Sequence, residues 1–314
     1  MLEIKNVTII GAGTMGHSLA QAFAQGGYQV WLHDIKEEIL QKARRLISAN
    51  LQTLLDLGLL SEEPAVILSR VRTTTNIKEA AQQADFIIEA IIEDETAKKE
   101  MFKILDEASP RQAILASNTS YLDIFKFVET KRPDKVLITH WFAPPHIVPL
   151  VEIVRGPETS KETVDTVKSL LLKLGKTPIV ISKFLPGFIA NRMQSALGNE
   201  VLFLLDNGYA SPEDIDLATK ASFGLRIPIL GVVKRMDFTG LDLTQKVLQN
   251  AAYKVPPQRN RSEVVDRLVA QGKLGVKTGK GFYDYGGRSP EEIMRERDIK
   301  LIKLYEFLKQ LGEL

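Results

Sequence analysis

Cysteine is absent from the 314 residues of the sequence. Its absence excludes disulfide bonds and thiolate metal sites, although it does not identify a compartment. The formal net charge is only +2, so no excess of either sign indicates a nucleic-acid or membrane-surface partner. No apolar run approaches the roughly 18 residues of a membrane span, and no secretory leader is recognisable. We therefore expect a cytoplasmic protein without nucleic-acid, membrane or metal partners.

The first half of the chain alternates short β-branched runs with longer segments of helical spacing. This alternation predicts βαβ units and a mostly parallel sheet that is covered on both faces, an α/β fold. The predicted strands are VTIIG (7–11), YQVWLHD (28–34), ADFIIEA (84–90), AILASN (113–118), KVLITHWF (135–142), LVEIV (150–154) and TPIVIS (177–182).

The pattern becomes helical after Pro186 and Gly187. Ser211 and Ser289 are each followed by a proline and two acidic residues, which is typical of the first turn of a helix. We therefore predict two domains, an α/β domain over residues 1–184 and an all-helical domain over residues 185–314.

A glycine-rich hexamer, GAGTMG, directly follows the first predicted strand and begins a helix. It fits the dinucleotide-binding pattern G-x-G-x-x-G, in which the glycines allow a tight turn, close approach of a pyrophosphate, and close packing of helix on strand. The N–H groups at the start of the helix would then bind the phosphates. The predicted cofactor-binding residues here are Gly11, Ala12, Gly13, Thr14, Met15 and Gly16.

Asp34 ends the second predicted strand, where an acidic residue binds the adenosine ribose of a dinucleotide. Its carboxylate would repel a 2′-phosphate, which favours NAD over NADP, although Lys36 nearby leaves that choice open. A flavin is the rival cofactor, and a glycine turn beside a surface aspartate is the structural alternative. Together the loop and the acid predict a Rossmann-like NAD-binding domain.

His140 lies at the carboxyl end of a predicted strand, and Glu152 interrupts an apolar strand twelve residues later. Ligands of open α/β sheets bind outside the carboxyl ends of the strands. A buried carboxylate needs a partner, and His140 is a candidate, with a lysine or arginine as the alternative. Such a pair fixes the tautomer of the imidazole and leaves its other nitrogen free to exchange a proton with a substrate hydroxyl.

Several further motifs follow in order along the chain: IIEAIIED (87–94), SNTS (117–120), H-x-F-x-P-P with P-L-V-E (140–152), PGFIANR (186–192), PEDID (212–216) and KTGKGFYDY (277–285). With GAGTMG and Asp34 they span nearly the whole chain. The sequence thereby resembles the NAD-dependent L-3-hydroxyacyl-CoA dehydrogenase family. The resemblance implies a homodimer formed through the helical domain.

The resemblance also implies roles for individual residues. His140 would be the catalytic base, with Glu152 as the residue that orients it. Ser120 would hold the substrate hydroxyl or carbonyl and line the cofactor site, and Asn191 would contact the reacting end of the substrate. As alternatives, the SNTS motif could merely cap a helix, and Asn191 could face solvent.

Three more residues would contact the cofactor if the resemblance holds. Glu93, which is part of IIEAIIED, and Lys98 follow the predicted strand ADFIIEA (84–90) and would contact the nicotinamide half of the cofactor. Lys277 would reach it from the second domain.

The sequence departs from the family at positions that concern the substrate. Ala143 replaces a usual asparagine that touches the cofactor, and Pro149 replaces a usual lysine. P-P-H-I-V-P-L-V-E is closer to the branch with L-gulonate 3-dehydrogenase and carnitine dehydrogenase. Lys234 and Arg235 would suit a free carboxylate as well as a thioester, and the basic cluster at residues 42–45 could bind a CoA phosphate or face solvent.

We expect a short-chain 3-hydroxyacyl-CoA such as 3-hydroxybutyryl-CoA, and hence a role in fatty acid metabolism, slightly ahead of a 3-hydroxy acid without CoA. A non-catalytic NAD(H)-binding protein is a further alternative. The 3-hydroxyisobutyrate and 6-phosphogluconate dehydrogenase group is another, but the glycine-rich substrate loop of that group is not found in the sequence.

Overall fold

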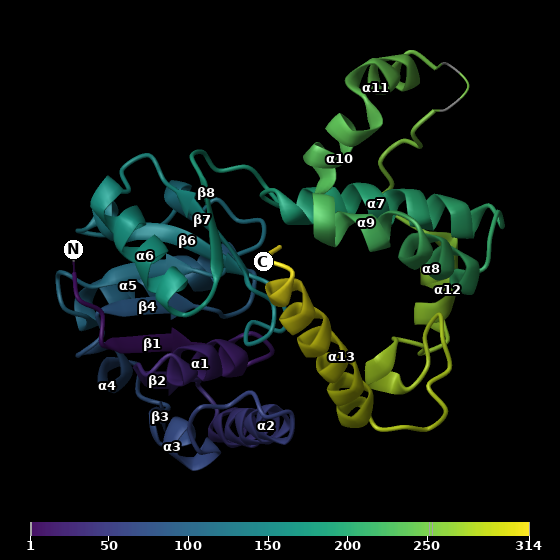
Figure 1. Ribbon diagram of the computed structural model, residues 1–314. Coiled ribbons are helices and arrows are strands. Elements are labelled where there is room, and N and C mark those ends of the chain that lie inside the picture. Colours follow the sequence, from purple (N-terminus) through teal and green to yellow (C-terminus); the bar gives the residue numbers. More distant parts are fainter. Residues whose placement is uncertain (1, 251, 253, 314) are drawn as a thin grey trace. The chain divides into compact units, whose positions relative to one another are not determined.

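Strands from the first part of the chain form one sheet in the computed structural model (Figure 1), which describes residues 2–250, 252 and 254–313. Within these residues, eight strands pair in the order β3-β2-β1-β4-β5-β6-β7-β8. All neighbours are parallel except β6 and β7, which are antiparallel. The strands are β1 (Asn6–Ile10), β2 (Gln29–His33), β3 (Val71–Thr74), β4 (Phe86–Glu89), β5 (Ile114–Ser117), β6 (Val136–Trp141), β7 (Leu150–Arg155) and β8 (Thr177–Ile181).

The alternation of side chains along the strands builds a core on each face of the sheet. In β1, Val7 and Ile9 belong to one cluster of buried residues and Ile10 belongs to the other. Both faces are therefore covered, as the apolar strands predict. The helices of this part are α1 (Gly16–Gln25), α2 (Glu37–Asp56), α3 (Pro64–Ser69), α4 (Ile77–Ala81), α5 (Glu95–Ala108) and α6 (Lys161–Lys173), with 3₁₀ turns η1 (Ile124–Lys126) and η2 (Pro133–Lys135).

The chain divides into two compact units, of which the first ends at Asn191 and the second begins at Arg192. The second unit is helical, as predicted, with Ser211 and Ser289 capping α8 and α13 through their side chains. Its helices are α7 (Ala190–Asp206), which starts in the first unit, α8 (Pro212–Ala221), α9 (Phe223–Leu230), α10 (Val232–Thr239), α11 (Leu241–Leu248), α12 (Glu263–Ala270) and α13 (Pro290–Gln310), with the 3₁₀ turn η3 (Val276–Thr278). The bounds 1–184 and 185–314 for the two domains stay a proposal.

One difference from the predicted elements has a simple cause. The strand β3, with the sequence VRTT, was not predicted because only one of its four residues is apolar. In the part of the chain that the structure describes, no helix combines the length and the apolar character needed to cross a membrane.

Candidate active site

The glycine loop lies between the carboxyl end of β1 and the start of α1. At two of its positions there is no room for a side chain. A Cβ atom on Gly11 would lie 2.6 Å from the carbonyl oxygen of Ala90, and φ of Gly11 is +98°. A Cβ atom on Gly16 would lie 1.7 Å from the carbonyl oxygen of Gly11. These glycines thus allow the tight turn and the close start of α1.

The other end of the loop is open. A Cβ atom on Gly13 would meet nothing within 4 Å, and Gly13 and Thr14 are exposed. The N-cap residue of α1, Met15, makes no side-chain hydrogen bond to the helix. Because the first N–H groups of a helix favour anions, this end of α1 fits a phosphate group.

Asp34 fixes the loop from the end of the neighbouring strand β2. Its Oδ2 accepts a hydrogen bond from the N–H of Ala12 at 2.9 Å. Two large apolar side chains that follow neighbouring strands are exposed: Ile35, after β2, is 78% exposed, and Ile92, after β4, is 71% exposed. Since β2 and β4 both flank β1, these residues lie on either side of the glycine loop. A carboxylate for a ribose, an open phosphate site and apolar surface for a base together fit an adenine dinucleotide.

The openness of the loop at Gly13 gives a test. We expect Gly13→Ala to fold normally and to raise the Kd for NADH by roughly tenfold or more, about 1.4 kcal/mol, because the added methyl group occupies the path of the pyrophosphate. Titration of NADH fluorescence measures the change. Gly198→Ala in α7, where a Cβ atom also meets nothing within 4 Å, is the matched control. An unchanged Kd in Gly13→Ala would show that the phosphates of NADH do not bind at this loop.

His140 and Glu152 face each other across the antiparallel pair β6 and β7. Nδ1 of His140 lies 2.7 Å from Oε2 of Glu152, and the residues are 3% and 0% exposed. The predicted pairing of these two side chains is therefore present. A carboxylate bonded to Nδ1 keeps the proton there, so Nε2 is the nitrogen that can accept one.

Glu152 is itself held in place from the start of α7. Its Oε1 accepts hydrogen bonds from the N–H groups of Ile189 and Ala190, both at 3.0 Å. Burial raises the pKa of Glu152, but the bonds from His140 and from these two N–H groups outweigh burial, and the net pKa is lowered. Glu152 is thus ionised at neutral pH and can stabilise a positive charge on the imidazole.

The free nitrogen of His140 is surrounded by the two other predicted catalytic residues. Nε2 lies 3.3 Å from Oγ of Ser120 and 3.4 Å from Nδ2 of Asn191. The rings of Phe142 and Phe188 lie against the imidazole, with centroids at 4.6 and 5.1 Å. The structure thus brings His140, Glu152, Ser120 and Asn191 together, whereas sequence reasoning gave Phe142 and Phe188 no place beside them.

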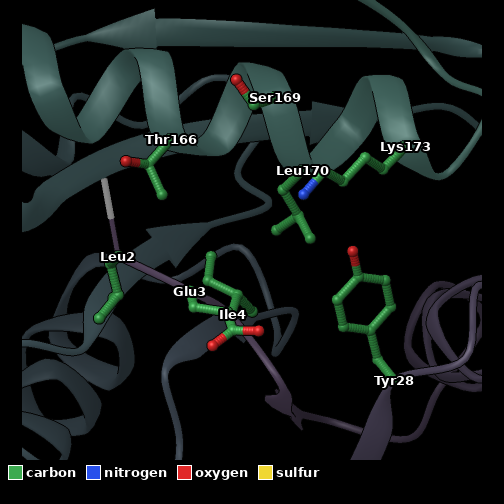
Figure 2. Close-up of a pocket in the computed structure, with 8 residues that line it drawn as sticks. All are labelled: Leu2, Glu3, Ile4, Tyr28, Thr166, Ser169, Leu170 and Lys173. Atoms are coloured by element: carbon green, nitrogen blue, oxygen red, sulfur yellow. The ribbon is translucent and has the colours of Figure 1, made fainter.

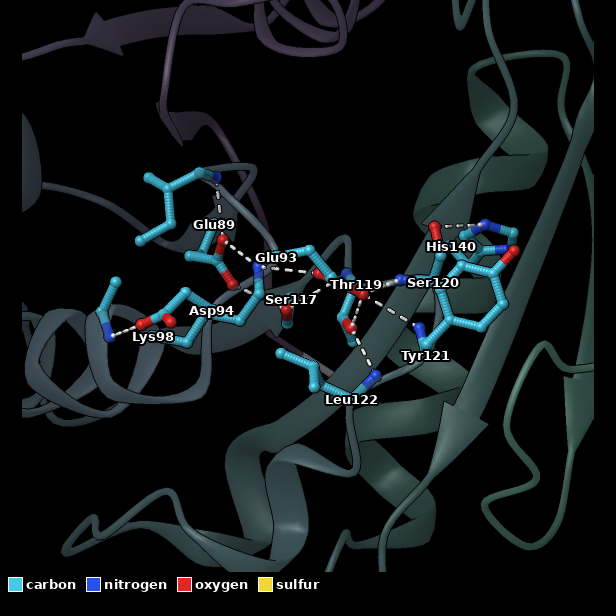
Figure 3. A network of polar contacts seen from close by, with 12 residues as sticks. Glu89, Glu93, Asp94, Lys98, Ser117, Thr119, Ser120, Tyr121, Leu122 and His140 are labelled. Atoms are coloured by element: carbon cyan, nitrogen blue, oxygen red, sulfur yellow. Dashed lines mark hydrogen bonds and ion pairs between the residues drawn. The ribbon is translucent and has the colours of Figure 1, made fainter. Parts of the chain in front are cut away.

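Glu93 holds the loop that carries Ser120 (Figure 3). Its Oε1 accepts hydrogen bonds from Oγ1 of Thr119 at 2.6 Å and from the N–H groups of Ser120 and Tyr121 at 2.8 and 2.9 Å. Burial raises the pKa of Glu93, but these bonds and the positive charge of Lys98 lower it further than burial raises it. Glu93 therefore positions Ser120; its contact with a cofactor stays a prediction.

Lys98 is buried beneath this loop, where it connects two carboxylates. Its Nζ lies 2.6 Å from Oε1 of Glu89 and 3.4 Å from Oε2 of Glu93. Glu89, which is 0% exposed, also accepts hydrogen bonds from Oγ of Ser117 at 2.6 Å and from the N–H of Ile91 at 2.8 Å. Sequence reasoning did not single out Glu89, although a carboxylate in the apolar run FIIEA is the same signal that indicated Glu152.

The remaining predicted residues belong to other elements of the fold. Lys277 is exposed in η3 of the second unit, and Lys234 lies exposed in α10; their roles stay predictions. In the basic cluster of α2, Nη1 of Arg44 donates to the carbonyl oxygen of Val71 at 2.7 Å, which gives this residue a structural role.

A pocket of about 290 Å³ is lined by residues 2–4, Tyr28 and part of α6 (Figure 2). Residues 2–4 precede β1 and Tyr28 precedes β2, so the pocket lies at the amino ends of these strands, and none of the predicted site residues lines it.

Comparison with known proteins identifies the family. Residues 6–184 match the model of the 3-hydroxyacyl-CoA dehydrogenase NAD binding domain, and residues 187–285 match that of the family's C-terminal domain. The chain belongs to the 3-hydroxyacyl-CoA dehydrogenase family. It is an NAD-dependent oxidoreductase, and the predicted family, fold class and cofactor are confirmed.

Two relatives of this family member differ in what their names say they act on. A probable 3-hydroxybutyryl-CoA dehydrogenase of Bacillus subtilis is 36% identical and covers 90% of this chain and 98% of its own. The 5-formyl-3-hydroxy-2-methylpyridine 4-carboxylate 5-dehydrogenase of Mesorhizobium japonicum is 32% identical and covers 98% and 99%. A crystal structure of a dehydrogenase for this pyridine compound, described as an NAD⁺-dependent dismutase, has a TM-score of 0.87 at 30% identity and covers 98% and 99%.

Proposed function

We propose that this dehydrogenase oxidises the 3-hydroxyl group of a short-chain 3-hydroxyacyl-CoA such as 3-hydroxybutyryl-CoA, with His140 as the general base. The observation that supports it is the arrangement around Nε2 of His140, with Ser120 at 3.3 Å, Asn191 at 3.4 Å and Glu152 on the opposite nitrogen. This arrangement offers one proton acceptor and two polar groups for the oxygen atoms of a substrate.

In the proposed mechanism, Nε2 of His140 takes the proton from the substrate hydroxyl group as the carbon loses its hydride. NAD, when bound, supplies the hydride acceptor. Ser120 and Asn191 hold the hydroxyl oxygen of the substrate, which becomes the carbonyl oxygen of the product. The ionised Glu152 stabilises the imidazolium through Nδ1–H, and in the reverse direction His140 returns the proton to the reduced carbonyl oxygen.

A carboxylated substrate without CoA is the second candidate, and one observation favours it. The Mesorhizobium relative aligns over 98% of this chain, whereas the Bacillus relative aligns over 90%. The family's C-terminal model ends at residue 285, so the helix α13 lies outside it. L-Gulonate, L-carnitine and the aldehyde of the pyridine relative belong to this candidate class.

A substrate panel followed by NADH absorbance, and for the pyridine aldehyde by loss of the aldehyde because a dismutation forms no net NADH, tests the proposal. It compares 3-hydroxybutyryl-CoA, longer 3-hydroxyacyl-CoAs, free 3-hydroxybutyrate, L-gulonate, L-carnitine and the pyridine aldehyde. The highest kcat/KM for 3-hydroxybutyryl-CoA is expected, and it would support a place in fatty acid metabolism. A higher value for a substrate without CoA would favour the second candidate. Tight NADH binding without turnover of any substrate would favour a non-catalytic protein. The cytoplasmic location remains part of the proposal.

Homodimer formation through the helical unit is also part of the proposal. Large apolar side chains are exposed along α9–α11, among them Leu225 at 71%, Val233 at 75% and Phe238 at 71%. A concentration of exposed apolar residues of this kind typically marks an interface, and a second copy of the chain is the partner that the resemblance implies.

We expect the double variant Val233→Glu with Phe238→Glu to elute as a monomer of 35.1 kDa, because two buried charges without partners oppose association. Multi-angle light scattering measures the mass. Val66→Glu, which changes an exposed residue of α3 in the first unit, is the matched control. A wild-type protein that is already monomeric, or a double variant that stays dimeric, would contradict this interface.

A further inference from the structure

The connection between β6 and β7 joins the two strands that carry His140 and Glu152. It runs over residues 142–149, so it begins two residues after His140 and ends three residues before Glu152. His140 pairs directly with Glu152 in the register of these strands. A shift of this connection would therefore move the imidazole relative to its carboxylate.

Lys176, which directly precedes β8, holds this connection through its ammonium group. Its Nζ donates to the carbonyl oxygen of Pro145 at 2.6 Å and to that of Val148 at 3.1 Å. The same ammonium lies 5.6 Å from the ring centroid of Trp141, the residue after His140. Two hydrogen bonds and a cation–π contact thus use the three donors of the group.

The cation is buried without an opposite charge. Lys176 is 9% exposed, and among the described residues no carboxylate forms an ion pair with it. Burial lowers the pKa of Lys176 to about 8, so its ammonium remains mostly protonated at neutral pH. An apolar side chain would fill this space without the desolvation cost of a charge, but it would leave two inward-facing carbonyl groups without their donor.

A second contact holds the same connection from α1. Oγ of Ser18, which is 1% exposed, lies 2.6 Å from Nδ1 of His146 and accepts a hydrogen bond from the N–H of His146 at 3.0 Å. The middle of the connection is thus held between α1 and the residue before β8. With this part already held by α1, the contacts of Lys176 to Pro145 and Val148 restrain the residues on either side.

We propose that Lys176 is a positioning residue for catalysis: by holding the carbonyl groups of Pro145 and Val148, it fixes the β6–β7 connection and thereby the alignment of His140 with Glu152. The proposal rests on the proposed catalytic role of these two residues. A residue with a merely structural role would change the amount of folded protein. A positioning residue also changes kcat and the hydrogen bond at Nδ1 of His140 in protein that is folded.

The test compares Lys176→Met, Lys176→Arg and, as a matched control, Lys173→Met at an exposed position three residues earlier. For each protein, kcat, KM, the Kd for NADH and the ¹H–¹⁵N NMR signal of the His140 Nδ1–H are measured at neutral pH. In Lys176→Met we expect kcat to fall by about 10- to 100-fold, as small misplacements of reacting groups do. The Nδ1–H signal should shift or broaden, while the Kd for NADH stays within about twofold of wild type.

Lys176→Arg retains donors for both carbonyl groups and should keep more of kcat than Lys176→Met. Wild-type kcat and an unchanged Nδ1–H signal in folded Lys176→Met would overturn the proposal, as would an equal loss in Lys173→Met. Failure of both Lys176 variants to fold would also overturn it, because stability would then account for the residue. If the wild-type protein turned over none of the panel substrates, the proposed function would fail, but the NMR comparison would still test Lys176.

Discussion

Replacing His140 by glutamine is expected to lower kcat by about 10²–10⁴-fold, the range that a positioned acid–base group supplies. Glutamine has no nitrogen that can take the substrate proton at neutral pH, although its size allows the strand β6 to keep its packing. The side chain lies at the carboxyl end of the sheet beside Ser120 and Asn191. Steady-state rates with the best substrate of the panel measure the loss.

NADH binding separates the loss of a base from a loss of the cofactor site. Among the described residues, the glycine loop and Asp34 form no hydrogen bond or ion pair with His140, so the Kd for NADH should stay near the wild-type value in His140→Gln. Turnover within about threefold of wild type would exclude His140 as the base. A Kd for NADH that rose in proportion to the loss of kcat/KM would instead place the residue in cofactor binding.

Glu152→Gln should have a smaller effect on kcat than His140→Gln. The amide oxygen of the glutamine can still accept hydrogen bonds from the N–H groups of Ile189 and Ala190. The amide has no negative charge, however, with which to stabilise the imidazolium. A loss about equal to that of His140→Gln would indicate that the two residues act as one unit, since such losses are not additive.

The pairing of His140 with Glu152 could be predicted because two simple rules lead to it. A carboxylate in an otherwise apolar strand needs a partner, and a histidine at the carboxyl end of a strand lies where ligands bind. The antiparallel register that places them opposite each other follows from the short connection between β6 and β7. Residues close in sequence thus supplied enough information for this part of the site.

The contacts that hold Ser120 and the β6–β7 connection in place could not be predicted in the same way. Glu93 reaches Ser120 from a different loop, 27 residues away along the chain. Lys176 reaches Pro145 over 31 residues. These contacts depend on how neighbouring loops pack at the edges of the sheet, and the periodicity of the sequence does not predict this packing. The strand β3 was missed for a related reason, because its pairing with β2 is not accompanied by an apolar pattern.

Replacing Lys98 by methionine is expected to lower the free energy of unfolding of the first unit by about 3–5 kcal/mol, the usual cost of leaving one member of a buried ion pair without its partner. Glu89 is 0% exposed, and among the described residues its ion pair with Lys98 at 2.6 Å is the only ion pair that it forms. The contact of Lys98 with Glu93 is lost as well, so Ser120 should be held less firmly and kcat should fall.

Urea unfolding followed by tryptophan fluorescence measures this change in one part of the molecule, because both tryptophans, Trp31 and Trp141, lie in the first unit. Lys99→Met is the matched control: the neighbouring lysine is 48% exposed, its ion pair with Glu129 lies at the surface, and its loss should cost less than about 1 kcal/mol. The double variant Lys98→Met with Glu89→Gln removes both charges and should recover much of the stability. If Lys98→Met cost no more than Lys99→Met, the buried pair would contribute nothing to the fold, and the firm placement of Ser120 would have to come from Glu93 alone.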